Sequence, residues 1–160
     1  MTKKSKTPQE SQVEMTEIVF PQHTNPLGTV FGGVVLSWID IAAGIAAQRH
    51  CENIVVTASV DAMHFLAPIH LGWIVSIRGT VNFASKQSCE VGIRIEAENP
   101  LQGIRVHNAS AYVTMAALDQ NRQPTTIPRL IPQTEVEKRR FEEAQMRREA
   151  RLVLKAKLDK

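Results

Sequence analysis

Aromatic residues are scarce in this sequence: they make up 5 % of its 160 residues, while hydrophobic residues make up 43 %. A folded core therefore has to be filled mainly by Val, Ile, Leu and Ala side chains. Cysteine is rarer still, and the spacing of Cys51 and Cys89 matches neither a disulfide framework nor a metal-binding motif. We therefore expect a reduced, cytoplasmic environment.

A long uninterrupted apolar run is also missing. The longest apolar stretch, residues 30–47, is broken by Gly, Ser and Asp, so we expect no membrane span. Residues 1–10 are polar, and we expect no signal peptide. The net charge of +3 is only weak evidence for a polyanionic partner. Because glutamates nearly balance the C-terminal arginines, we expect no nucleic-acid binding.

The length is typical of a single domain, and the composition divides the chain into three parts. Residues 1–11 read as a disordered tail, residues 12–132 as the folded domain, and residues 133–160 as a charged C-terminal helix and tail. Thr134 followed by Glu137 has the pattern of a helix capping box. Charges at helical spacing after it predict a solvated surface helix.

The folded part reads as one helix among long strands. A helix is predicted from Val34 to about His50, and apolar residues on nearly every side predict that it is buried. Strands are predicted at residues 13–20, 54–66, 73–83, 88–98 and 105–118. Alternation along residues 88–98 predicts that the apolar side chains face inward and the charged ones outward: Cys89, Val91, Ile93, Ile95 and Ala97 inward, and Glu90, Arg94, Glu96 and Glu98 outward. The order of these elements predicts an α+β fold in which a long antiparallel sheet wraps around the central helix.

Asp40 is the most informative single residue, because it lies within the apolar helix. Burial penalises an ionised carboxylate unless partners compensate, and it raises the pKa of the group. Asp40 is then either a structural residue that bonds to a neighbour or a catalytic acid or base. Taken alone, this feature leaves both interpretations equally open.

Glycines just before the helix favour the catalytic interpretation. Gly28, Gly32 and Gly33 permit close approach of the backbone, and free amides at a helix start bind negative oxygen. Such amides could stabilise an oxyanion. A tight entry into the helix would explain the same residues structurally, and a lone Gly-Gly pair is a weak signal.

The combination of segments is more specific. Residues 21–33, followed by the Trp-Ile-Asp of residues 38–40, resemble the signature of the acyl-CoA thioesterase family with the hotdog fold, of the brain acyl-CoA hydrolase type. Residues 56–65, 68–72 and 127–130 agree with it. The resemblance covers residues 14–132 in order, and it implies hydrolysis of acyl-CoA to free fatty acid and coenzyme A.

The resemblance also implies roles for individual residues. Asp40 corresponds to the catalytic carboxylate on the central helix, and Asn25 to the asparagine that works with it from the opposite subunit. Gly32 and Gly33 correspond to the helix start that receives the thioester carbonyl. The family implies homodimers, commonly assembled as trimers of dimers. Because the sequence has no cluster of metal ligands, we expect neither a metal nor a cofactor beyond the coenzyme A of the substrate.

Substrate-contacting residues follow from the same resemblance. Thr57 and Ser59 correspond to the strand that lines the site. Lys86 lies where the family contacts the nucleotide end of coenzyme A, and Arg105 and Arg129 are further candidates for its phosphates. For each of these three cations, a solvated surface charge is the alternative interpretation.

Some positions depart from the family pattern. Asp is frequent there where this sequence has His23 and Thr29, and a Gly-Asp pair where it has Gly72 and Trp73. We interpret His23 as a loop residue rather than a second acid or base. Two other functions on the same fold stay open: a non-catalytic acyl-CoA sensor, and a hydratase or dehydratase.

Overall fold

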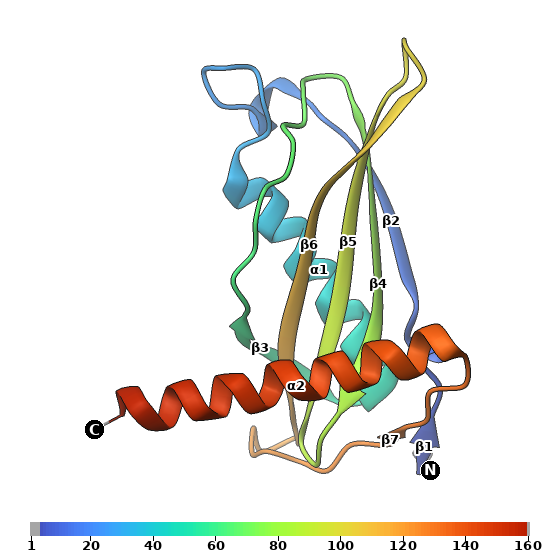
Figure 1. Cartoon of the computed structure of the whole chain (residues 1–160), viewed down its shortest axis with the longest axis vertical. Coiled ribbons are helices and arrows are strands. Elements are labelled where there is room, and N and C mark those ends of the chain that lie inside the picture. The colour runs from blue at the N-terminus through green and yellow to red at the C-terminus, as the bar shows by residue number, and fades with distance from the viewer. Residues whose placement is uncertain (1–3, 160) are drawn as a thin grey trace.

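The computed structural model describes residues 4–159 and shows a curled sheet with a helix on each of its two faces (Figure 1). The helices are α1 (Gly32–Cys51) and α2 (Glu135–Leu158), and short 3-10 helices lie at Pro8–Ser11 and Pro21–His23. The strands are β1 (Ser5–Lys6), β2 (Val13–Ile18), β3 (Ile54–Val60), β4 (Ile74–Ala84), β5 (Ser88–Asn99), β6 (Ile104–Leu118) and β7 (Arg129–Leu130).

The main sheet has the order β2-β4-β5-β6-β3, and all its neighbours are antiparallel. Helix α1 lies along one face of this sheet and α2 crosses the other (Figure 1). The expected α+β architecture, with a long antiparallel sheet around a central helix, is therefore confirmed. Within the described residues, neither helix is long and apolar enough to cross a membrane.

Aliphatic side chains fill the space between the sheet and α1. Alternate residues of β5 point inward and are at most 3 % exposed, as their alternation predicts: Cys89, Val91, Ile93, Ile95 and Ala97. Helix α1 meets them with fully buried alanines at positions 42, 43, 46 and 47, whose small side chains let the helix approach closely. Burying one such Val or Ile side chain from water contributes about 1.5–3 kcal/mol to the free energy of folding.

The opposite face of α1 is uncovered in the single chain, which corrects the expectation of a helix buried all round. Leu36 and Ile41 are 43 % and 52 % exposed, and Asp40 between them is exposed too. The reason is that the sheet lies against only one face of α1. An apolar patch next to an edge strand, here β3, is the usual mark of an interaction surface.

The N-terminal segment is ordered from residue 4 onward, so the predicted disordered tail over residues 1–11 is wrong for residues 4–11; residues 1–3 lie outside the described residues. Strand β1 pairs with β7 in parallel. The side chain of Lys6 is buried and donates hydrogen bonds to the Arg49 carbonyl at 2.6 Å and to Glu52 at 2.5 Å. A cation at the end of α1 satisfies a free carbonyl there and interacts favourably with the helix dipole.

Helix α2 begins with the predicted capping box: Thr134 accepts the amide of Glu137, and Glu137 accepts the amide of Thr134. The expectation that α2 is only a solvated helix is wrong. It covers Glu90, which was predicted to face outward into solvent but is 2 % exposed. Arg147 donates two hydrogen bonds to that carboxylate, at 2.7 and 3.1 Å. Its charge is therefore paired with the sheet and not with a glutamate on its own helix.

The strand predicted over residues 54–66 ends early. The ladder between β3 and β6 shifts register between Thr57 and Ser59 and stops at Val60. Residues 61–66 then leave the sheet in irregular conformation, which allows the chain to pass from the edge of the sheet toward the start of α1 (Figure 1). The other predicted strands and α1 agree with the structure to within about two residues at each end.

Candidate active site

A hydrogen bond joins two of the predicted site residues. The hydroxyl of Thr57, on β3, donates to Oδ1 of Asp40, on α1, over 2.5 Å. The Thr57 oxygen also lies 3.6 Å from the sulfur of Met115 on the neighbouring strand β6. The carboxylate is thereby oriented through one oxygen. Because Asp40 lies on the uncovered face of α1, its other oxygen has no protein hydrogen-bond donor within the described residues.

The start of α1 provides the second part of the site. Gly32 and Gly33 are its first residues, and no amide at a helix start has an acceptor within the helix. A Cβ at position 33 would lie 2.8 Å from the ring of Phe31, so only glycine fits without movement there. A Cβ at position 32 would lie 3.5 Å from the ring of Phe65. These amides are arranged to bind a negative or polarised oxygen.

Asn25 shapes the loop before α1. Its side-chain oxygen accepts the amides of Leu27 and Thr29 at 3.0 and 3.2 Å, and its Nδ2 donates to the Thr29 hydroxyl at 3.0 Å. No hydrogen bond joins Asn25 to Asp40 in the part of the chain that the structure describes. Within one chain, the two residues predicted to work together are therefore not joined by a hydrogen bond.

His23 and Ser59 are two further predicted or considered site residues, and neither forms a hydrogen bond with the Asp40 carboxylate in residues 4–159. The Nδ1 of His23 accepts the amide of Phe20 at 3.0 Å, and its ring packs edge-on against Trp38 at 5.5 Å. This fits the interpretation of His23 as a loop residue. Ser59 lies just beyond the register shift on β3 and is half-buried.

The three candidate coenzyme A contacts do not lie together. Lys86 lies in the turn between β4 and β5, where its carbonyl accepts the amide of Ile127, and Arg129 follows close by on β7. Arg105 pairs across from Glu98, at the other end of β5, and binds that glutamate at 2.8 Å. A strand rises about 3.4 Å per residue, so β5 separates the two groups by roughly 35 Å.

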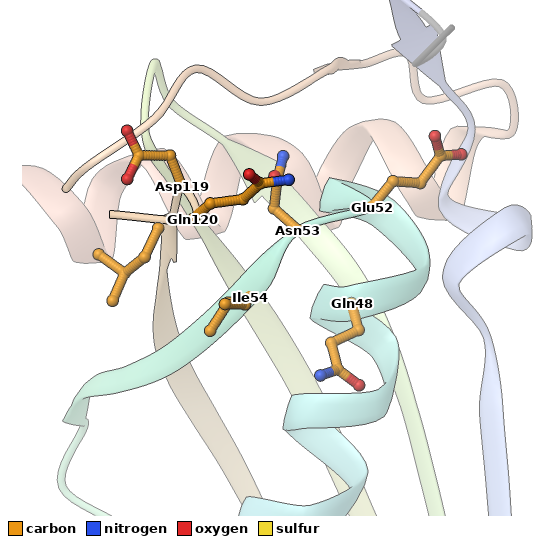
Figure 2. A pocket seen from close by; sticks show the side chains of 7 residues that line it. Gln48, Glu52, Asn53, Ile54, Asp119 and Gln120 are labelled. Carbon is orange, nitrogen blue, oxygen red and sulfur yellow. The ribbon is translucent and has the colours of Figure 1, made fainter. Parts of the chain in front are cut away.

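Two cavities lie away from these residues. Figure 2 shows a pocket of about 420 Å³ between the end of α1, the start of β3 and the turn after β6; it is lined by Gln48, Glu52, Asn53, Ile54, Leu118, Asp119 and Gln120. A groove of about 730 Å³ lies between α2 and the outer face of the sheet, with five arginines around it. Neither contains a residue predicted for catalysis.

Two side-chain relations near the site were not anticipated from the sequence. One is the ring of Phe65 against Gly32, and the other is an ion pair between Arg151 of α2 and Asp61, at 2.7 Å. Phe65 lies in a segment that was expected to be strand, and Arg151 lies in a helix that was expected to be solvated. No local pattern marks either contact, because both depend on how distant segments fold together.

The model of the thioesterase superfamily matches residues 27–104, the region that contains α1, β3, β4 and β5. A Bacillus subtilis protein named as an uncharacterized acyl-CoA thioester hydrolase is 41 % identical over 80 % of this chain and 74 % of its own length. The cytosolic acyl coenzyme A thioester hydrolase of Rattus norvegicus is 39 % identical over 86 % of this chain. The chain spans only 36 % of that relative's length.

Solved structures agree with the sequence relatives. A hexameric acyl-CoA thioesterase crystallised without ligand is 37 % identical, covers 96 % of this chain and 98 % of its own, and has a TM-score of 0.92. The acyl-CoA hydrolase of Staphylococcus aureus, solved with butyryl-coenzyme A and coenzyme A, is 34 % identical with a TM-score of 0.86, over 96 % of each chain. It is also known as variants with alanine in place of one asparagine, one threonine or one aspartate.

The fold is the hotdog fold of the thioesterase superfamily. The chain belongs to the acyl-CoA thioester hydrolase family within the thioesterase superfamily.

Proposed function

We propose that this protein hydrolyses acyl-CoA to a free fatty acid and coenzyme A. The observation that carries the proposal is the carboxylate of Asp40, oriented by Thr57 and open on one oxygen, on the helix whose start has free amides at Gly32 and Gly33. Family membership supports the same activity. The names of the rat and mouse relatives support a cytoplasmic location, and that location is part of the proposal.

One chain cannot complete the site by itself. At about 1.5 Å of rise per residue, Gly32 lies roughly 12 Å along the helix axis from Asp40. A thioester carbonyl needs an amide and a catalytic carboxylate each within about 3 Å of the reacting atoms. We therefore propose that Asn25 and the helix start of one chain face Asp40 and Thr57 of a second chain.

Three observations support this shared site. The uncovered apolar face of α1 lies beside the edge strand β3, which a second copy can pair with and cover. A structural relative with a TM-score of 0.92 is a hexamer, which fits a trimer of dimers. In the Staphylococcus aureus enzyme, the asparagine, aspartate and threonine chosen for substitution have the same order and spacing as Asn25, Asp40 and Thr57.

The chemistry follows from this arrangement. In one route Asp40 accepts a proton from the water that attacks the thioester carbon, the C–S bond breaks, and coenzyme A leaves as its thiolate and takes up that proton. In the other, Asp40 attacks the thioester carbon itself, the C–S bond breaks to release the coenzyme A thiolate, and water then hydrolyses the transient anhydride to the free acid and the Asp40 carboxylate. The amides at Gly32 and Gly33 stabilise the negative charge that develops on the carbonyl oxygen, and Asn25 positions the water or the carbonyl. We propose no metal and no cofactor in these steps.

For coenzyme A itself, we propose Lys86 and Arg129 as contacts to the phosphates, because they lie at the same end of the molecule and both are exposed. Arg105 is a weaker candidate in the same chain. It lies at the far end of β5, and its charge is already offset by Glu98. We propose that Ser59 lines the substrate channel on β3.

A thiol-release assay with short, medium and long acyl-CoAs, run in the presence of a chelator, tests the proposal. Wild-type protein is expected to turn over at least one of them, and Asp40→Asn to lose about 10²–10⁴-fold in kcat. Glu149→Gln, an amide substitution on the exposed surface of α2, is the matched control and should keep full activity. Tight binding of acyl-CoA without turnover would instead favour a sensor.

A further inference from the structure

Arg151 of α2 forms a partly buried ion pair with Asp61. The Arg151 Nη1 lies 2.7 Å from the Asp61 Oδ2, and the two side chains are 27 % and 17 % exposed. By contrast, the pair between Lys138 and Glu135 on the same helix is 51 % and 91 % exposed. A shielded, charge-assisted hydrogen bond of this kind holds its partners more firmly than an exposed pair does.

Asp61 begins the irregular segment of residues 61–66. This segment follows β3 in the chain and runs toward the start of α1 in space. The amide of Asp61 donates to Tyr112 at 3.0 Å, and the amide of Leu66 donates to Asn108 at 2.7 Å. Between these two anchors, no amide of residues 62–65 donates to another backbone group in the described part of the chain. The path of the segment is therefore fixed at its two ends, and the ion pair with Arg151 strengthens the first of them.

The same segment carries Phe65 to the proposed catalytic site. Its ring lies in van der Waals range of Gly32, where a Cβ would be 3.5 Å from the Phe65 Cζ. The ring is 54 % exposed, so its position depends on the backbone of the segment more than on surrounding side chains. A thioester whose carbonyl oxygen approaches the Gly32 amide would meet this ring beside its acyl chain.

Figure 1 shows the path of this connection. Helix α2 crosses the outer face of the sheet, and the irregular segment that follows β3 runs toward the start of α1. Arg147, one turn before Arg151, is fixed by Glu90 and stacks on the ring of Tyr112, with its guanidinium carbon 3.6 Å from the ring centroid. The part of α2 that presents Arg151 is thus itself held firmly on the sheet.

We propose that Arg151 and Asp61 are positioning residues for the thioesterase site. Through this pair α2 holds residues 61–66 in place, a role that we call the brace. The pair holds the segment so that Phe65 forms a fixed wall for the acyl group at the start of α1. This inference rests on the proposed hydrolysis of acyl-CoA. It gives α2 a role in substrate binding, although α2 lies on the opposite face of the sheet from Asp40.

Steady-state kinetics on Arg151→Gln and Asp61→Asn test the brace in the full-length protein. We expect KM for the preferred acyl-CoA to rise roughly fivefold with little change in kcat, because the wall binds the acyl group without touching the reacting atoms. Phe65→Ala should reproduce the effect. Arg151 also lies 3.7 Å from the buried Glu90, so Arg151→Lys, which keeps the positive charge beside both carboxylates, should retain much of the wild-type KM. Lys138→Gln, which breaks the exposed pair on α2, should leave KM unchanged.

A measurement without substrate separates this inference from the proposed function. Hydrogen exchange at the Leu66 amide and cleavage by chymotrypsin after Phe65 should both be faster in Arg151→Gln than in wild type or Lys138→Gln. Unchanged exchange and cleavage in a folded Arg151→Gln protein would overturn the brace. So would a KM equal to that of wild type. If wild-type protein hydrolyses no acyl-CoA, the proposed function fails, while the exchange data still decide whether α2 holds the segment.

Discussion

The hydroxyl of Thr57 donates to the carboxylate of Asp40 over 2.5 Å and so ties the edge strand β3 to helix α1 at the proposed reaction centre. The bond occupies one carboxylate oxygen and leaves the other for water or substrate. The hydroxyl thereby sets the orientation of the carboxylate.

Replacing Thr57 by Val should test that role, since the two side chains have nearly the same shape. A hydrogen bond to a charged group contributes about 1.5–3 kcal/mol, so kcat should fall roughly 10- to 100-fold. Thr57→Ser keeps the hydroxyl and should retain most of the activity. Steady-state kinetics on the two variants make the comparison. Equal kcat for Thr57→Val and wild type would remove Thr57 from the mechanism.

Mixing two inactive variants should reveal whether the site is shared between chains. Asn25→Ala and Asp40→Ala should each be inactive, because every site in either homodimer lacks one residue. After subunit exchange, one of the two sites in a mixed dimer has both residues intact, so up to a quarter of the wild-type activity per chain should return. The exchange itself is followed by native mass spectrometry. Mixed dimers without activity would show that the two residues do not cooperate across chains.

The buried pair of Glu90 and Arg147 should matter for the stability of the fold. Arg147→Met leaves the Glu90 carboxylate covered without its main partner, and it should lower the free energy of unfolding by about 3–5 kcal/mol. Combining it with Glu90→Leu should recover much of the loss, since no buried charge is then left unpaired. Arg139→Met breaks an exposed pair with Glu143 and should change stability by less than about 1 kcal/mol. Urea denaturation measures all three, and a double variant no more stable than Arg147→Met would contradict this account.

His50 should make the stability of the fold depend on pH. Its side chain is fully buried, and burial lowers the pKa of the imidazole below its ordinary 6.5, although the hydrogen bond between Nε2 and the Pro128 carbonyl opposes that shift. The unfolded chain therefore binds a proton at a higher pH than the folded chain does. The free energy of unfolding should be unaffected by this group above pH 6.5 and should fall as the pH drops below it.

Urea denaturation from pH 7.5 to 5.5 checks this dependence, with His50→Gln as the comparison. Glutamine can still donate a hydrogen bond to the Pro128 carbonyl but does not titrate. The variant should therefore lose less stability than wild type over the same range. The surface residue His64 is exposed and serves as a control, so His64→Gln should follow the wild-type curve. Parallel curves for wild type and His50→Gln would contradict the assignment.

Much of the architecture was predictable because it depends on local patterns. Alternation along residues 88–98 identified the inward side chains of β5, since successive residues of a strand point to opposite faces. The capping box of Thr134 and Glu137 located the start of α2, because it satisfies amides within a single turn. Asp40, Thr57 and the Gly32-Gly33 start were proposed from the family signature, and the structure brings the first two into contact.

Contacts and exposures that depend on long-range packing could not be predicted from local patterns. A periodic pattern describes the faces of an element but not which neighbour covers each face. For that reason Asp40 was expected to be buried and is exposed, while Glu90 was expected to be exposed and is covered by α2. The separation of Arg105 from Lys86, and the contact of Arg151 with Asp61, likewise arise from the antiparallel course of the strands and the packing of α2 across them. Residue types and local spacing fixed the chemistry available to this chain, whereas the association of distant segments determined which of those groups meet.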